Sequence, residues 1–315
     1  MTLEGGFVAG FTWGFPGARG QWGTPKAAAS MRLMAERLGL NWTTLAFVAR
    51  QDTAQSTVIR WREAPTATDE EVVWAIREAK GLGLKVCLKP MLGVVDGTWR
   101  AFIDFLDPDV PGEPRWGEWF ASYREYMVQF ASIAQTEGVE MLCVGCEQVK
   151  SDPRADDWRA LIAAVREVYS GLVTYNCDKY QEDRLTWWDA VDVISSSGYY
   201  PQGDWPRQLD RIEAVVRRHG KPFVFMEGGC PSRVGAPANP NNWRLQAPPS
   251  EDAQDAWYWD AFTATASRDW VGGFMFWDWR ALVHDVADAS SNDDYGVFGK
   301  KAEATIRAAY AERTN

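Results

Sequence analysis

Two glutamates end short apolar segments in positions where acid–base or nucleophilic chemistry is possible. Glu147 follows Cys143-Val144-Gly145-Cys146, and Glu227 follows Phe223-Val224-Phe225-Met226. A single carboxylate at such a position is ordinarily solvated or paired with a basic residue. Two of them can divide the work of catalysis, one protonated to release a leaving group and the other ionised to attack.

The aromatic content indicates which substrates such a pair would act on. The 315 residues include 18 Trp, 10 Tyr and 14 Phe. Aromatic rings pack against the flat C–H faces of sugars, while sugar hydroxyls need polar partners. Paired carboxylates in aromatic surroundings therefore favour glycoside hydrolysis, in which one carboxyl protonates the leaving oxygen and the other attacks the anomeric carbon. We expect an oligosaccharide or polysaccharide substrate and no cofactor.

Charge and composition exclude several other classes of function. The net charge of −10 argues against binding to nucleic acid or to anionic membranes. With only 2 His, a histidine-rich metal site is not expected. No run of 18 apolar residues could span a membrane.

The cysteines and the first residues bear on the compartment. The number of cysteines, 5, is odd, and each lies in or beside an apolar segment, which favours reduced, packed thiols. The residues after Met1 include neither a basic nor an apolar segment typical of a signal peptide. We therefore expect a cytoplasmic protein, with secretion after removal of a leader as the alternative.

Strand-like and helix-like segments alternate along the chain. Apolar segments predict eight strands, and amphipathic segments predict helices between them. The expected strands are 6–13, 42–49, 85–91, 140–146, 172–176, 191–196, 223–226 and 272–277. The expected helices are 26–38, 69–80, 116–136, 156–169, 207–218, 250–267 and 302–312, with a short helix near Trp187.

Eight strand–helix units predict an α/β fold of the (β/α)₈ TIM-barrel type. No Pro-, Gly- or Ser-rich linker interrupts the sequence, so residues 1–315 are expected to form a single domain. The alternative, a doubly wound sheet, would carry a G-x-G-x-x-G turn after its first strand. Residues 11–17 lack that pattern.

In such a barrel the carboxyl ends of the strands converge on one mouth, where active sites lie. Glu147 and Glu227 are the predicted catalytic pair. The other strand-end residues are predicted to bind substrate, namely Trp13, Arg50, Lys89, Asn176, Tyr199, Tyr200, Trp277 and Trp279. Other aromatic residues are expected to pack in the core, among them Trp116, Trp119, Tyr123, Trp257, Trp259 and Trp270.

The order of several short motifs resembles glycoside hydrolase family 113, a family of retaining β-mannanases in clan A with (β/α)₈ barrels. The motifs are Gly10-Phe11-Thr12-Trp13, Trp22-Gly23-Thr24-Pro25, Leu88-Lys89-Pro90, Asp96-Gly97-Thr98-Trp99-Arg100, Val144-Gly145-Cys146-Glu147, Tyr199-Tyr200-Pro201, Lys221-Pro222, Glu227-Gly228, Trp277-Asp278-Trp279 and Asp294-Tyr295-Gly296-Val297-Phe298-Gly299-Lys300. The resemblance extends almost from end to end.

The resemblance implies roles for individual residues. It implies that Glu147 is the general acid/base and Glu227 the nucleophile. A tyrosine after the sixth strand, Tyr199 or Tyr200, would contact the nucleophile. Trp277 would form the floor of the sugar site, and Lys89 would bond a sugar hydroxyl. A retaining mechanism would place the two carboxyl groups about 5–5.5 Å apart, and an inverting one about 6.5–9.5 Å apart.

Three features of the sequence near the expected sugar site depart from the pattern of the related glycoside hydrolases. Cys146 stands where clan A commonly has Asn and the family often has Thr. Met91 stands where the family often has His, and Ser196-Ser197-Gly198 replaces Ile-Asp-Ala. All three changes bear on which sugar is accepted.

We therefore expect a retaining glycosidase that cleaves β-1,4-mannosyl linkages. One alternative is a related clan A β-glycosidase, exo-acting or with another β-glycan as substrate. A non-catalytic sugar-binding barrel is a less favoured alternative, because binding alone does not need two strand-end glutamates. A metal-dependent hydrolase is also less favoured, because the sequence has only two histidines and neither ends a predicted strand. Endo or exo action, the chain length accepted and the oligomeric state stay open.

Overall fold

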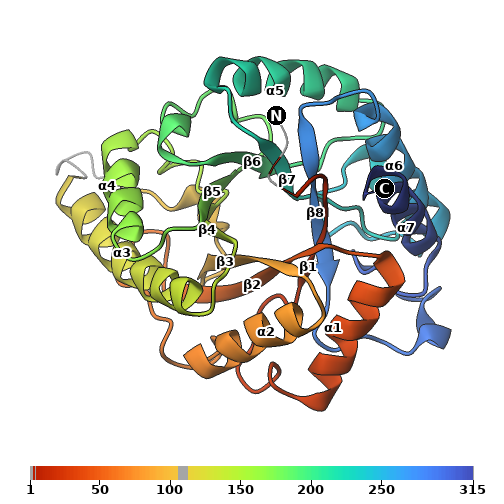
Figure 1. Ribbon diagram of the computed structural model, residues 1–315, viewed down its shortest axis with the longest axis horizontal. Helices are drawn as coiled ribbons and strands as arrows, with labels where there is room; N and C mark the ends of the chain where they lie inside the picture. The colour runs from red at the N-terminus through yellow and green to blue at the C-terminus, as the bar shows by residue number, and fades with distance from the viewer. Residues whose placement is uncertain (1–2, 4, 106–112, 315) are drawn as a thin grey trace.

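Eight parallel strands close into a barrel with helices around it (Figure 1). The computed structural model describes residue 3 and residues 5–105 and 113–314. Each strand pairs with its neighbours in chain order, and β1 pairs with β8 to close the ring. The strands are β1 (Val8–Trp13), β2 (Trp42–Gln51), β3 (Lys85–Val94), β4 (Met141–Cys146), β5 (Leu172–Cys177), β6 (Val193–Ser197), β7 (Phe223–Glu227) and β8 (Val271–Trp279).

Seven α-helices lie outside the barrel in the described part of the chain. They are α1 (Pro25–Leu38), α2 (Asp69–Gly81), α3 (Glu113–Thr136), α4 (Ala155–Arg166), α5 (Trp205–His219), α6 (Glu251–Thr265) and α7 (Lys301–Thr314). Between β5 and β6 the connection contains only the short 3₁₀ helix η2 (Trp188–Ala190), which matches the short helix predicted near Trp187. The predicted (β/α)₈ barrel is confirmed.

Local sequence signals place several helix ends. The Thr24 side chain accepts a hydrogen bond from the Ala27 N–H, and Pro25 occupies the first position of α1. At α2, Thr68 and Glu71 form a reciprocal capping box. Gly39 ends α1 in a left-handed conformation with φ 65°. These helix ends were predictable because their caps are local.

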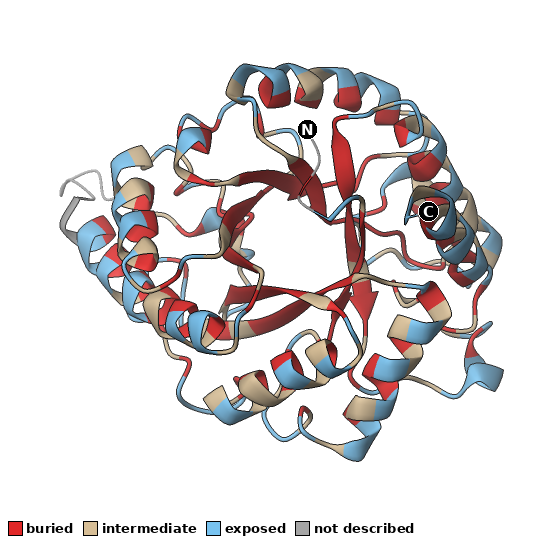
Figure 2. Cartoon of the chain, viewed as in Figure 1, coloured by how far each residue is buried: buried red, intermediate tan, exposed pale blue. Residues whose placement is uncertain are grey.

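Most residues of the strands are buried, as the colouring of the barrel shows (Figure 2). The strands are buried almost throughout, and each helix turns a buried side toward the barrel and an exposed side outward. The predicted core face of α3 is confirmed, because Trp116, Trp119 and Tyr123 are buried. Trp257 and Trp270 are buried as well, but the packing role expected for Trp259 is wrong, since it is 67% exposed.

Two further expectations can be compared with the structure. All five cysteines are free and buried, as the odd number and apolar surroundings predicted. Among the described residues, no helix is both long enough and apolar enough to span a membrane.

Candidate active site

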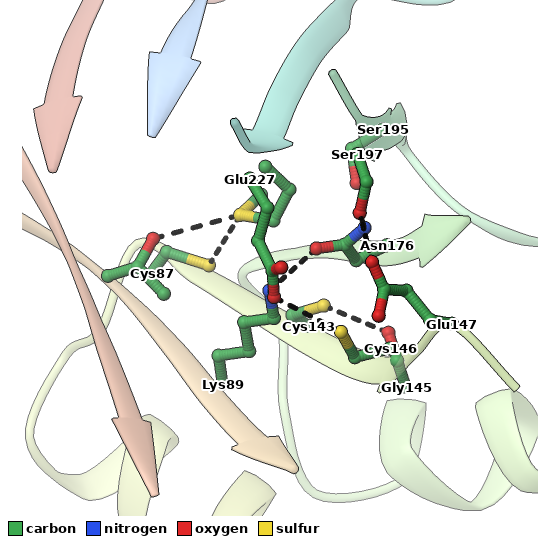
Figure 3. Close-up of polar contacts among 12 residues, drawn as sticks. Cys87, Lys89, Cys143, Gly145, Cys146, Glu147, Asn176, Ser195, Ser197 and Glu227 are labelled. Carbon is green, nitrogen blue, oxygen red and sulfur yellow. Dashed lines mark hydrogen bonds and ion pairs between the residues drawn. The ribbon is translucent and has the colours of Figure 1, made fainter. Parts of the chain in front are cut away.

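Glu227 lies at the end of β7, inside the mouth of the barrel and 3% exposed. Its Oε1 accepts a hydrogen bond of 2.5 Å from the Lys89 ammonium of β3, and its Oε2 accepts one of 3.1 Å from the Tyr199 hydroxyl. The Cys146 thiol lies 3.3 Å from Oε1 (Figure 3). The tyrosine contact with Glu227 was predicted for Tyr199 or Tyr200, and Tyr199 makes it.

Glu147 follows β4 directly and is 6% exposed. Its Oε1 accepts a hydrogen bond of 2.6 Å from the Ser197 hydroxyl, and its Oε2 one of 2.9 Å from the Arg100 guanidinium. Its backbone is left-handed, with φ 52°, a conformation uncommon for residues other than glycine. The sharp turn of the chain at this point carries the carboxyl group toward Glu227.

One carboxylate oxygen of Glu147 and one of Glu227 lie within 4.8 Å of each other. This separation agrees with the spacing of about 5–5.5 Å expected of a retaining pair and leaves too little room for the water of an inverting one.

The charges around the two carboxyl groups differ. Burial alone would raise the pKa of Glu227, but the Lys89 and Arg100 cations outweigh it, and the pKa is lowered. The same contacts act on the bases: burial favours neutral Lys89, yet the nearby Cys146 and Glu227 raise the Lys89 pKa above its usual value. Glu227 is therefore held as a carboxylate, ready to act as a nucleophile.

Asn176, at the end of β5, connects the two halves of the site. Its Oδ1 accepts a hydrogen bond of 2.6 Å from Lys89, and its Nδ2 donates one of 3.0 Å to Ser197. Ser197 in turn donates to Glu147. The chain of contacts from Glu227 through Lys89, Asn176 and Ser197 to Glu147 fixes the two carboxyl groups relative to one another (Figure 3).

Two more predicted residues lie at the mouth. Trp277 of β8 is partly exposed and packs on Phe15, with ring centroids 4.5 Å apart. It clusters with Ala46, Met91 and Cys146, on the inner side of the barrel. Arg50 is partly exposed near the end of β2. It makes no ion pair with any described residue.

Three predicted substrate-binding residues are not at the mouth. The Trp13 and Trp279 rings are buried outside the barrel, where both indole N–H groups point at the Ser30 hydroxyl of α1 at 3.4 and 3.1 Å. The Tyr200 ring is also buried, and its hydroxyl donates to Glu182 at 2.8 Å. These rings fill the layer between strands and helices, so the substrate-binding prediction is wrong for all three.

Three residues of the site were missed from the sequence. Arg100 belongs to one of the shared motifs but had no predicted role, and Ser197 stood out only as a departure from the family pattern. Asp178 follows β5 immediately. Burial and then the negative charge of Glu147 raise the pKa of Asp178 to about 8, which places a third carboxyl group within electrostatic reach of Glu147.

The site has the spacing but not the charge of a metal centre. One ligand atom from each of Cys146, Glu147 and Glu227 lies within 4.8 Å of the others. Both carboxylates, however, are already paired with a cation, Glu227 with the buried Lys89 and Glu147 with Arg100. A metal ion would have to displace these cations, so the residues fit an ion-paired carboxylate pair rather than a metal site.

Comparisons with known proteins agree with this geometry. The family model described as Glycoside Hydrolase Family 113 matches residues 11–300. A structure described as a complex of a GH113 β-1,4-mannanase is 52% identical, with a TM-score of 0.95, covering 98% of this chain and 100% of that one. The β-mannanase AaManA from Alicyclobacillus acidocaldarius, in complex with ManMIm, is 40% identical, with a TM-score of 0.94 and 99% coverage of both chains.

More distant structures share the fold alone. A β-D-glucuronidase from Dictyoglomus thermophilum is 15% identical, with a TM-score of 0.68, covering 98% of this chain and 51% of that one. The comparison with curated proteins gave no match. The family model and the similar structures together extend over nearly the whole chain, and the chain therefore belongs to glycoside hydrolase family 113.

Proposed function

We propose that this enzyme is a retaining β-mannanase in which Glu227 is the nucleophile and Glu147 the general acid/base. The observation that carries the proposal is the pair of carboxylate oxygens within 4.8 Å of each other, set in different charge environments. The similar structures described as a β-1,4-mannanase and a β-mannanase support mannan as the substrate.

In the first step, Glu227 attacks the anomeric carbon while Glu147 gives its proton to the leaving oxygen. The C–O bond to the leaving sugar breaks, and a covalent glycosyl ester forms at Glu227. Arg100, 2.9 Å from Glu147, stabilises the carboxylate that Glu147 becomes when it loses its proton. In the second step, Glu147 takes a proton from water, which attacks the anomeric carbon and releases Glu227.

Lys89 and Tyr199 hold Glu227 in position through both steps. Each donates to a different oxygen of the carboxylate, which leaves the group fixed in orientation. Trp277, with its partly exposed ring on the inner side of the barrel, is the floor for the reacting sugar.

The roles are separated by the products of two variants in the presence of azide. Glu147→Ala should still form the glycosyl enzyme from an aryl β-mannoside with an acidic phenol, because that leaving group needs no acid. Hydrolysis of that glycosyl enzyme should be slow, and azide, which needs no general base, should restore turnover by attacking the anomeric carbon and releasing Glu227, giving a β-mannosyl azide. Glu227→Ala should be inactive on good and poor leaving groups, and any azide product should be the α-anomer.

Product configuration is read by NMR, with the exposed Glu125→Ala as a matched control that should keep wild-type activity. Swapped configurations would reverse the two roles, and wild-type activity in both variants would contradict the pair. Assays on mannan, xylan and β-glucan test the sugar: preference for xylan or β-glucan would favour the related β-glycosidase.

A further inference from the structure

Trp99 is an exposed tryptophan that directly precedes a residue in contact with Glu147. In the described part of the chain, Trp99 is 40% exposed, and only Trp243 and Trp259 are more so. Its neighbour in sequence, Arg100, contacts Glu147 at 2.9 Å. Phe102, two residues further, is 56% exposed, and its ring lies 5.5 Å from that of Trp99 at an interplanar angle of 82°.

The segment that carries the two rings is firmly anchored. The Phe102 N–H donates to the Trp99 carbonyl at 2.9 Å, within the 3₁₀ turn Arg100–Phe102. The Arg100 Nε donates to the Cys146 carbonyl at 2.9 Å, and the Lys150 N–H donates to the Ala101 carbonyl at 3.2 Å. Ala101 is 1% exposed. The rings are therefore held at the surface by a segment whose other side chains point inward.

We propose that Trp99 and Phe102 bind the sugar units on the leaving-group side of the scissile bond. This proposal rests on the proposed function. The general acid must face the leaving oxygen, and Arg100 connects Trp99 and Phe102 to the general acid, Glu147, rather than to the nucleophile.

The chemistry of the two rings suits a neutral sugar chain. An exposed indole presents a large, rigid apolar face of the kind that packs on the C–H face of a pyranose. Val95, 51% exposed, adds apolar surface on the same β3–α3 connection. Because the second step runs the first in reverse, a sugar acceptor in place of water would bind the same rings, so they also affect transglycosylation.

The test compares substrates that differ only on the leaving-group side. The leaving group of a β-mannosyl fluoride is a fluoride ion, which cannot contact Trp99. Mannohexaose has sugar units on the leaving-group side that can. Trp99→Ala should lower kcat/KM for mannohexaose by about tenfold or more, chiefly through KM, and leave the fluoride within about twofold of wild type. Phe102→Ala should act in the same direction, and Trp99→Phe should recover part of the loss.

Trp259→Ala is the matched control, since this tryptophan is 67% exposed on α6, and both substrates should be unaffected. An equal loss on both substrates would overturn the proposal, because Trp99 would then act by positioning Arg100. No loss on either would overturn it as well. A wild-type enzyme that cleaves neither mannohexaose nor mannan would instead refute the proposed function, and this proposal with it.

Discussion

At the scale of the residue, the difference between the two glutamates comes from their neighbours. Lys89 is 0% exposed and donates to both Glu227 and Asn176. A buried ammonium is tolerated here because two oxygens satisfy it and one of them is charged. The partners of Glu147 are instead the Ser197 hydroxyl and the Arg100 guanidinium, which is more accessible than the Lys89 ammonium. The same side-chain type can therefore perform two roles.

Replacing Lys89 by Met should move the acid limb of the pH profile. The ammonium helps to lower the pKa of Glu227, so its loss raises that pKa. The nucleophile acts only when ionised, so the acid limb should move to higher pH, with kcat/KM about a hundredfold lower at the optimum. The measurement is kcat/KM against pH on an aryl β-mannoside. Lys85→Met, at the first residue of the same strand, should leave the limb unchanged.

Trp277→Ala tests the floor of the sugar site. Removal of the indole should raise the barrier for kcat/KM by about 3 kcal/mol, roughly a hundredfold in rate, because the reacting sugar loses its apolar support. Steady-state kinetics and circular dichroism are measured together. A folded variant with an unchanged rate would show that Trp277 only packs against Phe15.

At the scale of the element, strand alternation separates the predicted site residues that reach the mouth of the barrel from those that do not. On β1, the Thr12 side chain faces the inside of the barrel. Its neighbours Phe11 and Trp13 therefore face outward, and both pack in the same hydrophobic core. Applying this alternation would have removed Trp13 from the predicted site. The fold itself was predictable because strand–helix alternation and helix caps are encoded locally.

Alternation alone would have failed at the catalytic residues. On β7, the Met226 side chain packs inside the barrel, so strand alternation alone would point the side chain of the next residue, Glu227, outward. The pairing between β6 and β7 shifts, however, from Ser196 opposite Phe225 to Ser197 opposite Glu227. This irregularity turns Glu227 inward. Arg100 was not predictable as a site residue, because its contact with Glu147 depends on a loop that no local signal specifies.

The turn after β4 has its own support on the outer side of the barrel. The Gln148 N–H donates to the Tyr175 hydroxyl at 3.0 Å, and that hydroxyl donates to Asp152. Burial raises the pKa of Asp152 to about 7, against the opposing effect of Tyr175. The Asp152 carboxyl group therefore changes charge near neutral pH, in the same turn of the chain that follows Glu147.

Asp152→Asn should make the stability less dependent on pH. The folded protein keeps the Asp152 proton up to about pH 7, whereas the unfolded chain releases it near its ordinary value of 3.8. The native state binds more protons between these values, so this group lowers the stability as pH rises from about 4 to 7. The loss is at most a few kcal/mol in total, because the stability falls by roughly 1.4 kcal/mol for each pH unit within this window.

The measurement is urea unfolding of both proteins at several pH values. The stability difference, variant minus wild type, should grow in favour of Asp152→Asn as pH rises through this window. A difference independent of pH would contradict the raised pKa of Asp152.

At the scale of the whole molecule, the site exists only because the ring of strands closes. Glu147 directly follows β4 and Glu227 ends β7, whereas Trp277 lies on β8, which must reach β1 to complete the barrel. At this seam Val8 pairs with Gly273. The Tyr310 hydroxyl of α7 also donates to the Gly10 carbonyl at 2.8 Å, so the last helix is tied to the first strand.

Gly273→Ala should disrupt closure of the barrel at this seam. Gly273 has φ 148°, and a Cβ there would lie 2.3 Å from the Val8 carbonyl oxygen and 2.6 Å from its nitrogen. Both are backbone atoms that cannot move without separating the strands, so we expect a loss of about 3 kcal/mol or more in unfolding free energy. Gly81→Ala is the control, because a Cβ there meets no atom within 4 Å apart from its chain neighbours and the backbone of its own helix, so α2 should be unchanged or stabilised. Thermal unfolding of both variants provides the comparison. A Gly273→Ala protein as stable as wild type would show that the seam can shift, and the spacing of Glu147 and Glu227 would then not depend on closure at this position.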